Sequence, residues 1–377
     1  MKIYADNAAT TKLDIDAFEA MKPYLLEDYA NPSSAYSFSK KAKHALKEAR
    51  KTIAECINAE PEQIIFTSGG TESNNHAIKH FTVSSDICHV VTSAIEHHSV
   101  LYACENSGFE RFIVPVDRYG VVSADELEKV LVRDRPAIAS CDSTLVTIMT
   151  VNNEIGTIQR IKELSEISHR YRAVFHTDAV QAVGHIPIDV QAMGIDMLSA
   201  SAHKFNGPKG IGFLYSRNGL LQPYHHGGAQ EFGIRAGTEN VPAIVGMAVA
   251  LKKNTKEMTH NAEHLHHLTE VFLTALRSAE IDYLINGHPT DRLPGNINIS
   301  FKGRSGEGLM HMLDLKGVCV STGSACDSVN QQVSHVIKAI DVPADYREGT
   351  IRVTFGKDNS DQDAVDVANA LIKMIRV

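Results

Sequence analysis

The sequence predicts an α/β protein with a large domain, built on a mostly parallel seven-stranded sheet, and a smaller α+β domain. In the first part of the chain, short runs rich in β-branched residues alternate with amphipathic helical patterns. This alternation is typical of parallel strands joined by crossover helices. We expect the seven strands in residues 63–67, 89–92, 111–114, 145–149, 174–176, 197–199 and 210–215.

The length and composition of the chain limit the possible classes of protein. Its 377 residues, 43% of them hydrophobic, can bury a substantial core and exceed the usual size of one domain. The formal net charge of -8 argues against nucleic acid or an anionic membrane as a partner. No stretch approaches the roughly 20 apolar residues of a transmembrane helix, and no signal peptide is recognisable, so we expect a cytoplasmic protein. The six cysteines form no CxxC pair, which favours reduced thiols.

Helical patterns separate the predicted strands. Residues 42–57 carry apolar side chains at helical spacing, and Ser123 with Glu126 forms a capping box that opens another helix. From about residue 259 the pattern changes to strand-like runs at residues 297–301, 318–321 and 351–355, with helices between them.

We therefore expect a large domain of residues 14–258 and a small domain formed by residues 1–13 and 259–377. The histidines at positions 260, 264, 266 and 267 could in principle bind a metal ion, but they are more typical of a solvated helix face. No metal site is expected.

The chemically suggestive residues come directly after predicted strands. They include Gly70 and Thr71, His97, Asn153, Asp178, and residues 201–204. In an open parallel sheet the ligand crevice lies at the carboxyl ends of the strands, so these dispersed positions are expected to converge on one site.

Lys204 and Asp178 suit pyridoxal phosphate. A lysine can hold the cofactor aldehyde as a Schiff base, and a buried carboxylate can keep the pyridine nitrogen protonated. Ser201 and His203, beside the lysine, can donate to the phosphate. For the lysine alone, the simpler interpretation is a strand that ends in an exposed lysine.

Nine motifs, in this order and spacing, resemble those of the pyridoxal phosphate-dependent cysteine desulfurases of the NifS/IscS type, in the class V aminotransferase group. The resemblance implies the fold type I of pyridoxal phosphate-dependent transferases. It runs nearly from end to end of the chain through residues 4–11, 31–34, 67–73, 96–97, 151–156, 178–181, 199–210, 235–240 and 324–326.

The resemblance implies roles at the cofactor. Gly70 and Thr71 lie at a helix start, where free N–H groups favour a phosphate dianion, although a helix cap alone would also explain the threonine. Ser201 and His203 resemble further phosphate ligands, and Thr238 resembles a threonine that reaches the phosphate of the neighbouring subunit. That implies a homodimer with shared sites.

The remaining roles concern the ring and the substrate. Asp178 resembles the partner of the pyridine nitrogen, and Gln181 the residue that binds the phenolic oxygen. His97 resembles the imidazole that stacks on the ring and transfers protons. The residues implied at the substrate L-cysteine are Asn31, Asn153 and Arg352, whose planar guanidinium can bind the α-carboxylate; a solvent-facing arginine is the alternative for Arg352.

Cys326 carries the distinguishing chemistry. It lies in Gly323–Cys326, after a strand and before a helical segment, which places it on a turn and away from an apolar face. By resemblance it accepts sulfur as a persulfide and passes it to an acceptor protein such as an iron-sulfur scaffold. The pattern leaves open which acceptor is served, and whether Cys326 ligates a cluster in a complex.

Two other function classes are alternatives to a desulfurase. A class V aminotransferase or selenocysteine lyase would share Lys204, but a transaminase has no need of Cys326. A catalytically silent scaffold would not need Lys204 with Asp178. The chain also departs from the family pattern at Tyr36, Ser39, Ala202, Ala229 and Phe232, which puts the arrangement of the entrance and the dimer contacts in question.

Overall fold

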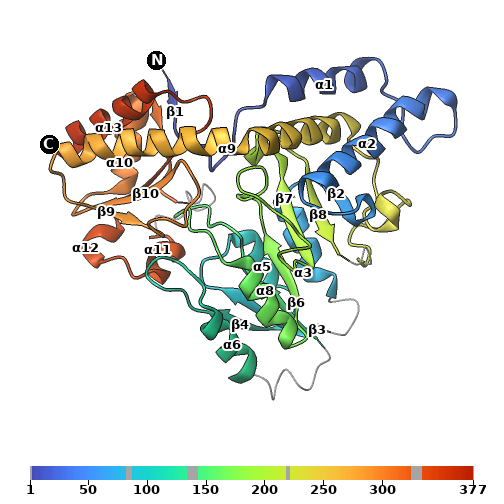
Figure 1. The fold of residues 1–377 in the computed structure, drawn as a ribbon, viewed down its shortest axis with the longest axis horizontal. Coiled ribbons are helices and arrows are strands. Elements are labelled where there is room, and N and C mark those ends of the chain that lie inside the picture. Colours follow the sequence, from blue (N-terminus) through green and yellow to red (C-terminus); the bar gives the residue numbers. More distant parts are fainter. Residues whose placement is uncertain (1, 82–86, 134–142, 218–220, 324–332, 377) are drawn as a thin grey trace.

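A computed structural model describes residues 2–81, 87–133, 143–217, 221–323 and 333–376. Figure 1 shows a central sheet with helices around it and a smaller lobe that contains both ends of the chain. The long helix α9 (Val241–Ser278) runs across both parts.

The central sheet has the strand order β2-β8-β7-β6-β5-β3-β4. All neighbouring pairs are parallel except those made by β8, which runs antiparallel to both β2 and β7. The predicted mostly parallel, seven-stranded sheet is therefore confirmed. Its strands are β2 (Ile64–Thr67), β3 (Ile87–Ser93), β4 (Glu110–Val114), β5 (Ser143–Thr147), β6 (Val174–Asp178), β7 (Met197–Ser201) and β8 (Gly212–Ser216).

Helices cover both faces of this sheet. One apolar cluster joins α3 and α5 to one face, and a larger cluster joins α2, α6, α8 and the first half of α9 to the other. Because both faces are covered, strands such as β2, β7 and β8 are buried along their length, whereas the edge strand β4 is partly exposed. The helices are α1 (Ile15–Leu26), α2 (Lys40–Cys56), α3 (Gly70–Lys79), α5 (His98–Glu105), α6 (Ala124–Arg133) and α8 (Ile161–Arg170), with short 3-10 turns η1 (Ser37–Ser39), η2 (Pro61–Gln63), η3 (Ala202–Lys204) and η4 (Glu231–Gly233).

The small lobe contains an antiparallel sheet of order β12-β10-β9 and a parallel pair, β1 with β11. The pair joins the N-terminal segment to the C-terminal part of the chain, since Ile3 aligns with Val318. Strand β9 was not predicted from the sequence, and β11 is shorter than predicted. The elements are β1 (Ile3–Tyr4), β9 (Tyr283–Asn286), β10 (Asn296–Phe301), β11 (Val318–Cys319), β12 (Thr350–Thr354), α10 (Gly306–Leu315), α11 (His335–Ala339), α12 (Ala344–Arg347) and α13 (Asp361–Ile375).

Helix α9 passes the predicted domain boundary at residue 258 without a break. Its packing changes there. Ile244 and Leu251 belong to the core of the large sheet, whereas Leu268 and Phe272 belong to the core of the small lobe. The division at residue 258 stays a prediction made from the sequence pattern. Within the described ranges, no helix combines the length and apolarity needed to cross a membrane.

Candidate active site

A pocket of about 470 Å³ opens where the parallel strands end. The strand order places β6 between β5 and β7, so the residues after these strands come together. Ten residues predicted from the sequence line this pocket: Gly70, Thr71, His97, Asn153, Asp178, Gln181, Ser201, His203, Lys204 and Arg352.

The start of α3 forms one end of the pocket. The first hydrogen bond of its helical ladder runs from Ser73 N to Gly69 O, so the N–H groups before Ser73 have no partner inside the helix. A methyl group placed on Gly70 would lie only 2.5 Å from Cγ2 of Val180. Glycine therefore lets the backbone donors lie at the pocket surface, where the helix dipole favours an anion.

Asp178 is the last residue of β6, and its side chain is buried. Its Oδ2 accepts a hydrogen bond of 2.7 Å from Nδ2 of Asn74, and its Oδ1 accepts one of 3.0 Å from the backbone N–H of Val180. These two donors fix the carboxylate plane. A carboxylate held in this way has lone pairs left for a further donor in the pocket.

Lys204 follows β7 within the turn η3. Its Nζ donates to the backbone carbonyls of Ala8, at 2.6 Å, and Ala9, at 2.9 Å. The carbonyl of Lys204 accepts from Nε2 of His185 at 2.8 Å. The N-terminal segment thus holds the lysine amine inside the pocket, which excludes the simpler interpretation of an exposed strand-end lysine.

A second lysine, Lys209, also lines the pocket, which the sequence did not indicate. Its side chain is exposed, whereas Lys204 is partly buried. Lys209 therefore supplies a natural control for the assignment of Lys204.

His97 follows β3 and caps helix α5. Its Nδ1 accepts a hydrogen bond of 3.1 Å from the backbone N–H of Ser99, so a neutral ring carries its proton on Nε2. Burial lowers the pKa of His97 below its ordinary value, which keeps the imidazole neutral near pH 7. A neutral ring with Nε2–H can exchange protons with a group in the pocket.

His203 lies between the lysine and the N-terminal segment. Its Nδ1 is 3.1 Å from the hydroxyl oxygen of Thr10, and its backbone carbonyl accepts from Thr11. Burial, together with the nearby positive charge of Lys204, lowers the pKa of His203 to about 4. The imidazole is therefore neutral near pH 7 and can donate one hydrogen bond.

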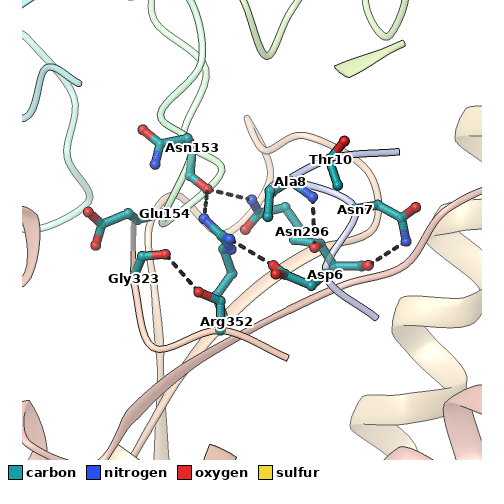
Figure 2. A network of polar contacts seen from close by, with 12 residues as sticks. Asp6, Asn7, Ala8, Thr10, Asn153, Glu154, Asn296, Gly323 and Arg352 are labelled. Carbon is teal, nitrogen blue, oxygen red and sulfur yellow. Dashed lines mark hydrogen bonds and ion pairs between the residues drawn. The ribbon is translucent and has the colours of Figure 1, made fainter. Parts of the chain in front are cut away.

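Arg352 approaches the pocket from β12 of the small lobe. It is 1% exposed, which rules out the solvent-facing alternative. Figure 2 shows its guanidinium between Asp6 and the backbone of Asn153. Nη2 forms an ion pair of 2.8 Å with Oδ1 of Asp6, and Nη1 donates to the carbonyl of Asn153 at 3.0 Å.

Three predicted residues lie elsewhere. Asn31 is exposed and accepts a hydrogen bond from Ser33 N, outside this pocket. Thr238 is exposed as well. Cys326 lies outside the described residues, so its predicted role stays a prediction.

The thiols within the described residues differ in environment. Cys104 is buried, and burial raises its pKa to about 12. Cys56 and Cys319 are only partly buried.

The departures from the family pattern lie away from the pocket lining. Tyr36, Ala229 and Phe232 are exposed. Ser39 is buried and donates to the carbonyl of Tyr36, while Ala202 is buried and accepts from a backbone N–H. None of the five lines the pocket within the described part of the chain, although Ala202 lies between the lining residues Ser201 and His203.

Sequence reasoning missed several groups that shape the site. Asn74 and Ser99 orient Asp178 and His97, and Asn74 Nδ2 also donates to Ser99 Oγ at 2.9 Å. Asn74 stands four residues after Gly70, on the same helical face, which is a spacing that could have identified it.

Glu96, next to His97, is fully buried. Its Oε1 accepts from Ser93 Oγ at 2.5 Å and from Met149 N at 2.9 Å, and its Oε2 has no hydrogen-bond partner in the described structure. Burial raises the pKa of Glu96 to about 8. The side chain is therefore protonated near pH 7.

We expect Glu96→Gln to remove a pH dependence of stability. Between the ordinary pKa of 4.5 and the folded value of about 8, the unfolded chain releases a proton that the folded chain keeps, so stability falls as pH rises. The free energy of unfolding falls by about 1.4 kcal/mol per pH unit across this window. Urea unfolding of both proteins at pH 5.5 and 8.5 measures it, because other titrating groups cancel in the comparison. Equal pH slopes in the two proteins would contradict a protonated Glu96.

The donor set fits pyridoxal phosphate. Backbone donors at a glycine-lined helix start suit its phosphate, the oriented carboxylate of Asp178 suits its ring nitrogen, and the amine of Lys204 lies in the same pocket. These three features occupy one cavity of adequate size.

Comparison with known proteins agrees with this site. A model of the family "Aminotransferase class-V" matches residues 3–367. A cysteine desulfurase IscS from Dictyoglomus turgidum is 47% identical, with 100% of this chain and 95% of the relative covered. The cysteine desulfurase of Homo sapiens is 39% identical, with 96% and 79% covered.

Two solved structures are similar to this chain over nearly its full length. A NifS-like protein superposes with a TM-score of 0.91 at 34% identity, covering 100% of both chains. A structure described as SspA in complex with cysteine superposes with a TM-score of 0.80 at 35% identity, covering 94% of this chain and 99% of the other.

The fold and the pocket are those of a class-V aminotransferase, the family to which the chain belongs. Enzymes of this family use pyridoxal phosphate. Within the family, the similarity over the full length to cysteine desulfurases makes the chain an enzyme of that kind.

Proposed function

We propose that this enzyme takes sulfur from L-cysteine, releases L-alanine, and holds the sulfur as a persulfide on Cys326 for an acceptor protein such as an iron-sulfur scaffold. The observation that carries the proposal is the convergence of Lys204, Asp178 and Arg352 on one pocket. An amine, an oriented carboxylate and a buried guanidinium are the groups needed to hold pyridoxal phosphate and an amino acid together.

Pyridoxal phosphate would be held by the N–H groups at Gly70 and Thr71, by Ser201 and His203 at its phosphate, and by Asp178, Gln181, Asn153 and Lys204 around its ring. When bound, the ring draws electrons from the α-carbon of the amino acid and so makes its proton removable.

The chain's own residues bind the substrate and move its protons. Arg352 binds the α-carboxylate, and Asn153, whose carbonyl fixes the guanidinium, lies beside it. Lys204 Nζ takes the proton from the α-carbon, since its amine already lies inside the pocket. His97, neutral and with its proton on Nε2, exchanges a second proton.

Sulfur transfer requires a thiolate. Cys326 Sγ attacks the substrate sulfur, an S–S bond forms, and the C–S bond breaks with its electron pair passing to the carbon skeleton. Protonation of that carbon gives alanine. The balance is one cysteine and one thiol consumed, and one alanine and one persulfide formed, with no external oxidant.

Thr238 belongs, in this proposal, to the site of a second subunit in a homodimer. It is exposed, while its segment is anchored by an ion pair of 2.8 Å between Arg235 Nε and Oε1 of Glu72, near the start of α3. The segment that carries Thr238 is thus fixed beside one pocket while the threonine is free to contact another molecule.

Asp178→Ala tests the proposal. We expect the variant to retain cofactor through the phosphate and lysine contacts but to lose alanine formation by about 10²–10³-fold, because a neutral ring withdraws electrons poorly. The measurement is alanine released per bound cofactor. Asp189→Asn serves as the control and should act normally, because this half-buried carboxylate accepts a hydrogen bond from Asn58 and does not line the pocket. Near-normal alanine formation by Asp178→Ala would refute the role.

A further inference from the structure

Arg352 carries a buried charge that needs a counter-ion. A guanidinium that is 1% exposed has almost no water around it, and an unpaired charge in such a place is strongly unfavourable. Asp6 supplies the charge partner, 346 residues away in the chain, through the 2.8 Å ion pair with Nη2.

The two partners of the guanidinium occupy only some of its hydrogen-bond donors. Asp6 and the carbonyl of Asn153 each accept one N–H, and Nε of Arg352 has no hydrogen-bond partner in the described structure. An arginine has five N–H donors, so donors remain for a bidentate carboxylate. The side chain is therefore fixed and still able to bind a ligand.

Asp6 is itself held firmly. Its backbone forms a bridge with Thr354, two residues beyond Arg352, and its carbonyl accepts from the hydroxyl of Tyr4 at 3.0 Å. Two backbone hydrogen bonds flank Asp6: Asn7 N donates to Thr354 O, and Thr354 N donates to Ala5 O. The N-terminal segment and β12 thus carry the two members of the ion pair at a fixed separation.

Asp6 contacts the guanidinium from outside the pocket. Arg352, Asn153 and Ala8 line the pocket, whereas Asp6 does not. The carboxylate of Asp6 therefore holds the guanidinium without occupying the space that a substrate carboxylate would take.

We propose that Asp6 is a positioning residue that aims Arg352 and so gives the enzyme its selectivity for amino acids with an α-carboxylate. The proposal rests on the proposed function of Arg352. Without the charge of Asp6, the guanidinium loses the partner that fixes its Nη2 edge and turns toward water in the pocket. The remaining N–H groups of Arg352 then no longer point together toward the position of the substrate carboxylate.

The test compares two amines that differ only in the carboxylate, L-alanine and ethylamine. Each is titrated into the holoenzyme, and the change in the visible absorption of the cofactor gives an apparent Kd. We expect the wild-type preference for alanine to fall by roughly tenfold in Asp6→Asn, which keeps the shape and one acceptor, and further in Asp6→Ala. The Kd of ethylamine should change little in both variants.

Asp14→Asn is the matched control. Asp14 is a buried carboxylate in the same N-terminal segment, paired with Lys357 at 2.7 Å and Lys253 at 3.1 Å, and it does not contact Arg352. Its loss should lower stability, because these partners hold the pKa of Asp14 at about 2, yet leave the alanine preference unchanged.

Arg352→Ala distinguishes a failure of the positioning role of Asp6 from a failure of the proposed role of Arg352. If it abolishes the alanine preference while both Asp6 variants keep the wild-type value, the positioning role of Asp6 is wrong and the proposed function stands. If Arg352→Ala itself keeps the preference, the assignment of Arg352 to the substrate carboxylate fails.

Discussion

Lys204→Ala is expected to abolish turnover and the covalent retention of pyridoxal phosphate. The amine of Lys204 is held inside the pocket by the carbonyls of Ala8 and Ala9, at 2.6 and 2.9 Å. The other lysine that lines the pocket among the described residues, Lys209, is exposed, so we expect it not to take over the role once Lys204 is truncated. Because the Lys204 amine both carries the cofactor and moves the substrate proton, its loss removes two functions at once.

The measurement is borohydride reduction of the purified variant, followed by mass spectrometry of its peptides. The wild type should carry the cofactor mass on the peptide with Lys204, and the variant should carry none. Lys209→Ala is the control, since Lys209 lines the same pocket but is exposed. Cofactor trapped on Lys209 in the Lys204→Ala variant, with activity retained, would mean that the lysine is wrongly assigned.

Cys326→Ser should separate cofactor chemistry from sulfur transfer. The variant keeps Lys204, Asp178 and Arg352, so cysteine should still change the visible absorption of the cofactor. Alanine and persulfide should nevertheless fall to background, because a hydroxyl is far less nucleophilic than a thiolate near neutral pH. Alanine and persulfide are quantified over the same time course.

Cys319→Ser is the matched control, because Cys319 is a partly buried thiol close to Cys326 in the sequence and should not be needed. Full activity of Cys326→Ser, or loss of activity in Cys319→Ser alone, would move the sulfur-accepting role to another thiol.

The sequence predicted the central sheet because short runs rich in β-branched residues alternate with amphipathic helical patterns along this part of the chain. The strand starts and ends differ by a few residues, as for β6, which extends from the predicted 174–176 to Asp178. Strand β9 was missed because Tyr283–Asn286 is short and only partly buried, which leaves no clear alternation.

The site was predictable where the residues follow strands or glycines, as for Gly70, Asp178 and Lys204. Contacts between distant segments were not. Asn74 and Asp178 are 104 positions apart, and Asp6 and Arg352 are 346 positions apart, so neither pair has a local pattern. Such pairs form only when the sheet order and the return of the N-terminal segment bring them together.

The position of the transferred sulfur tests the account most directly. The wild-type holoenzyme is mixed with one equivalent of L-cysteine, quenched with a thiol-alkylating reagent, and its peptides are analysed by mass spectrometry. We predict one added sulfur on the peptide that contains Cys326, together with one equivalent of L-alanine. Added sulfur on a peptide that contains Cys56, Cys88, Cys104, Cys141 or Cys319, with none on Cys326, would contradict the account.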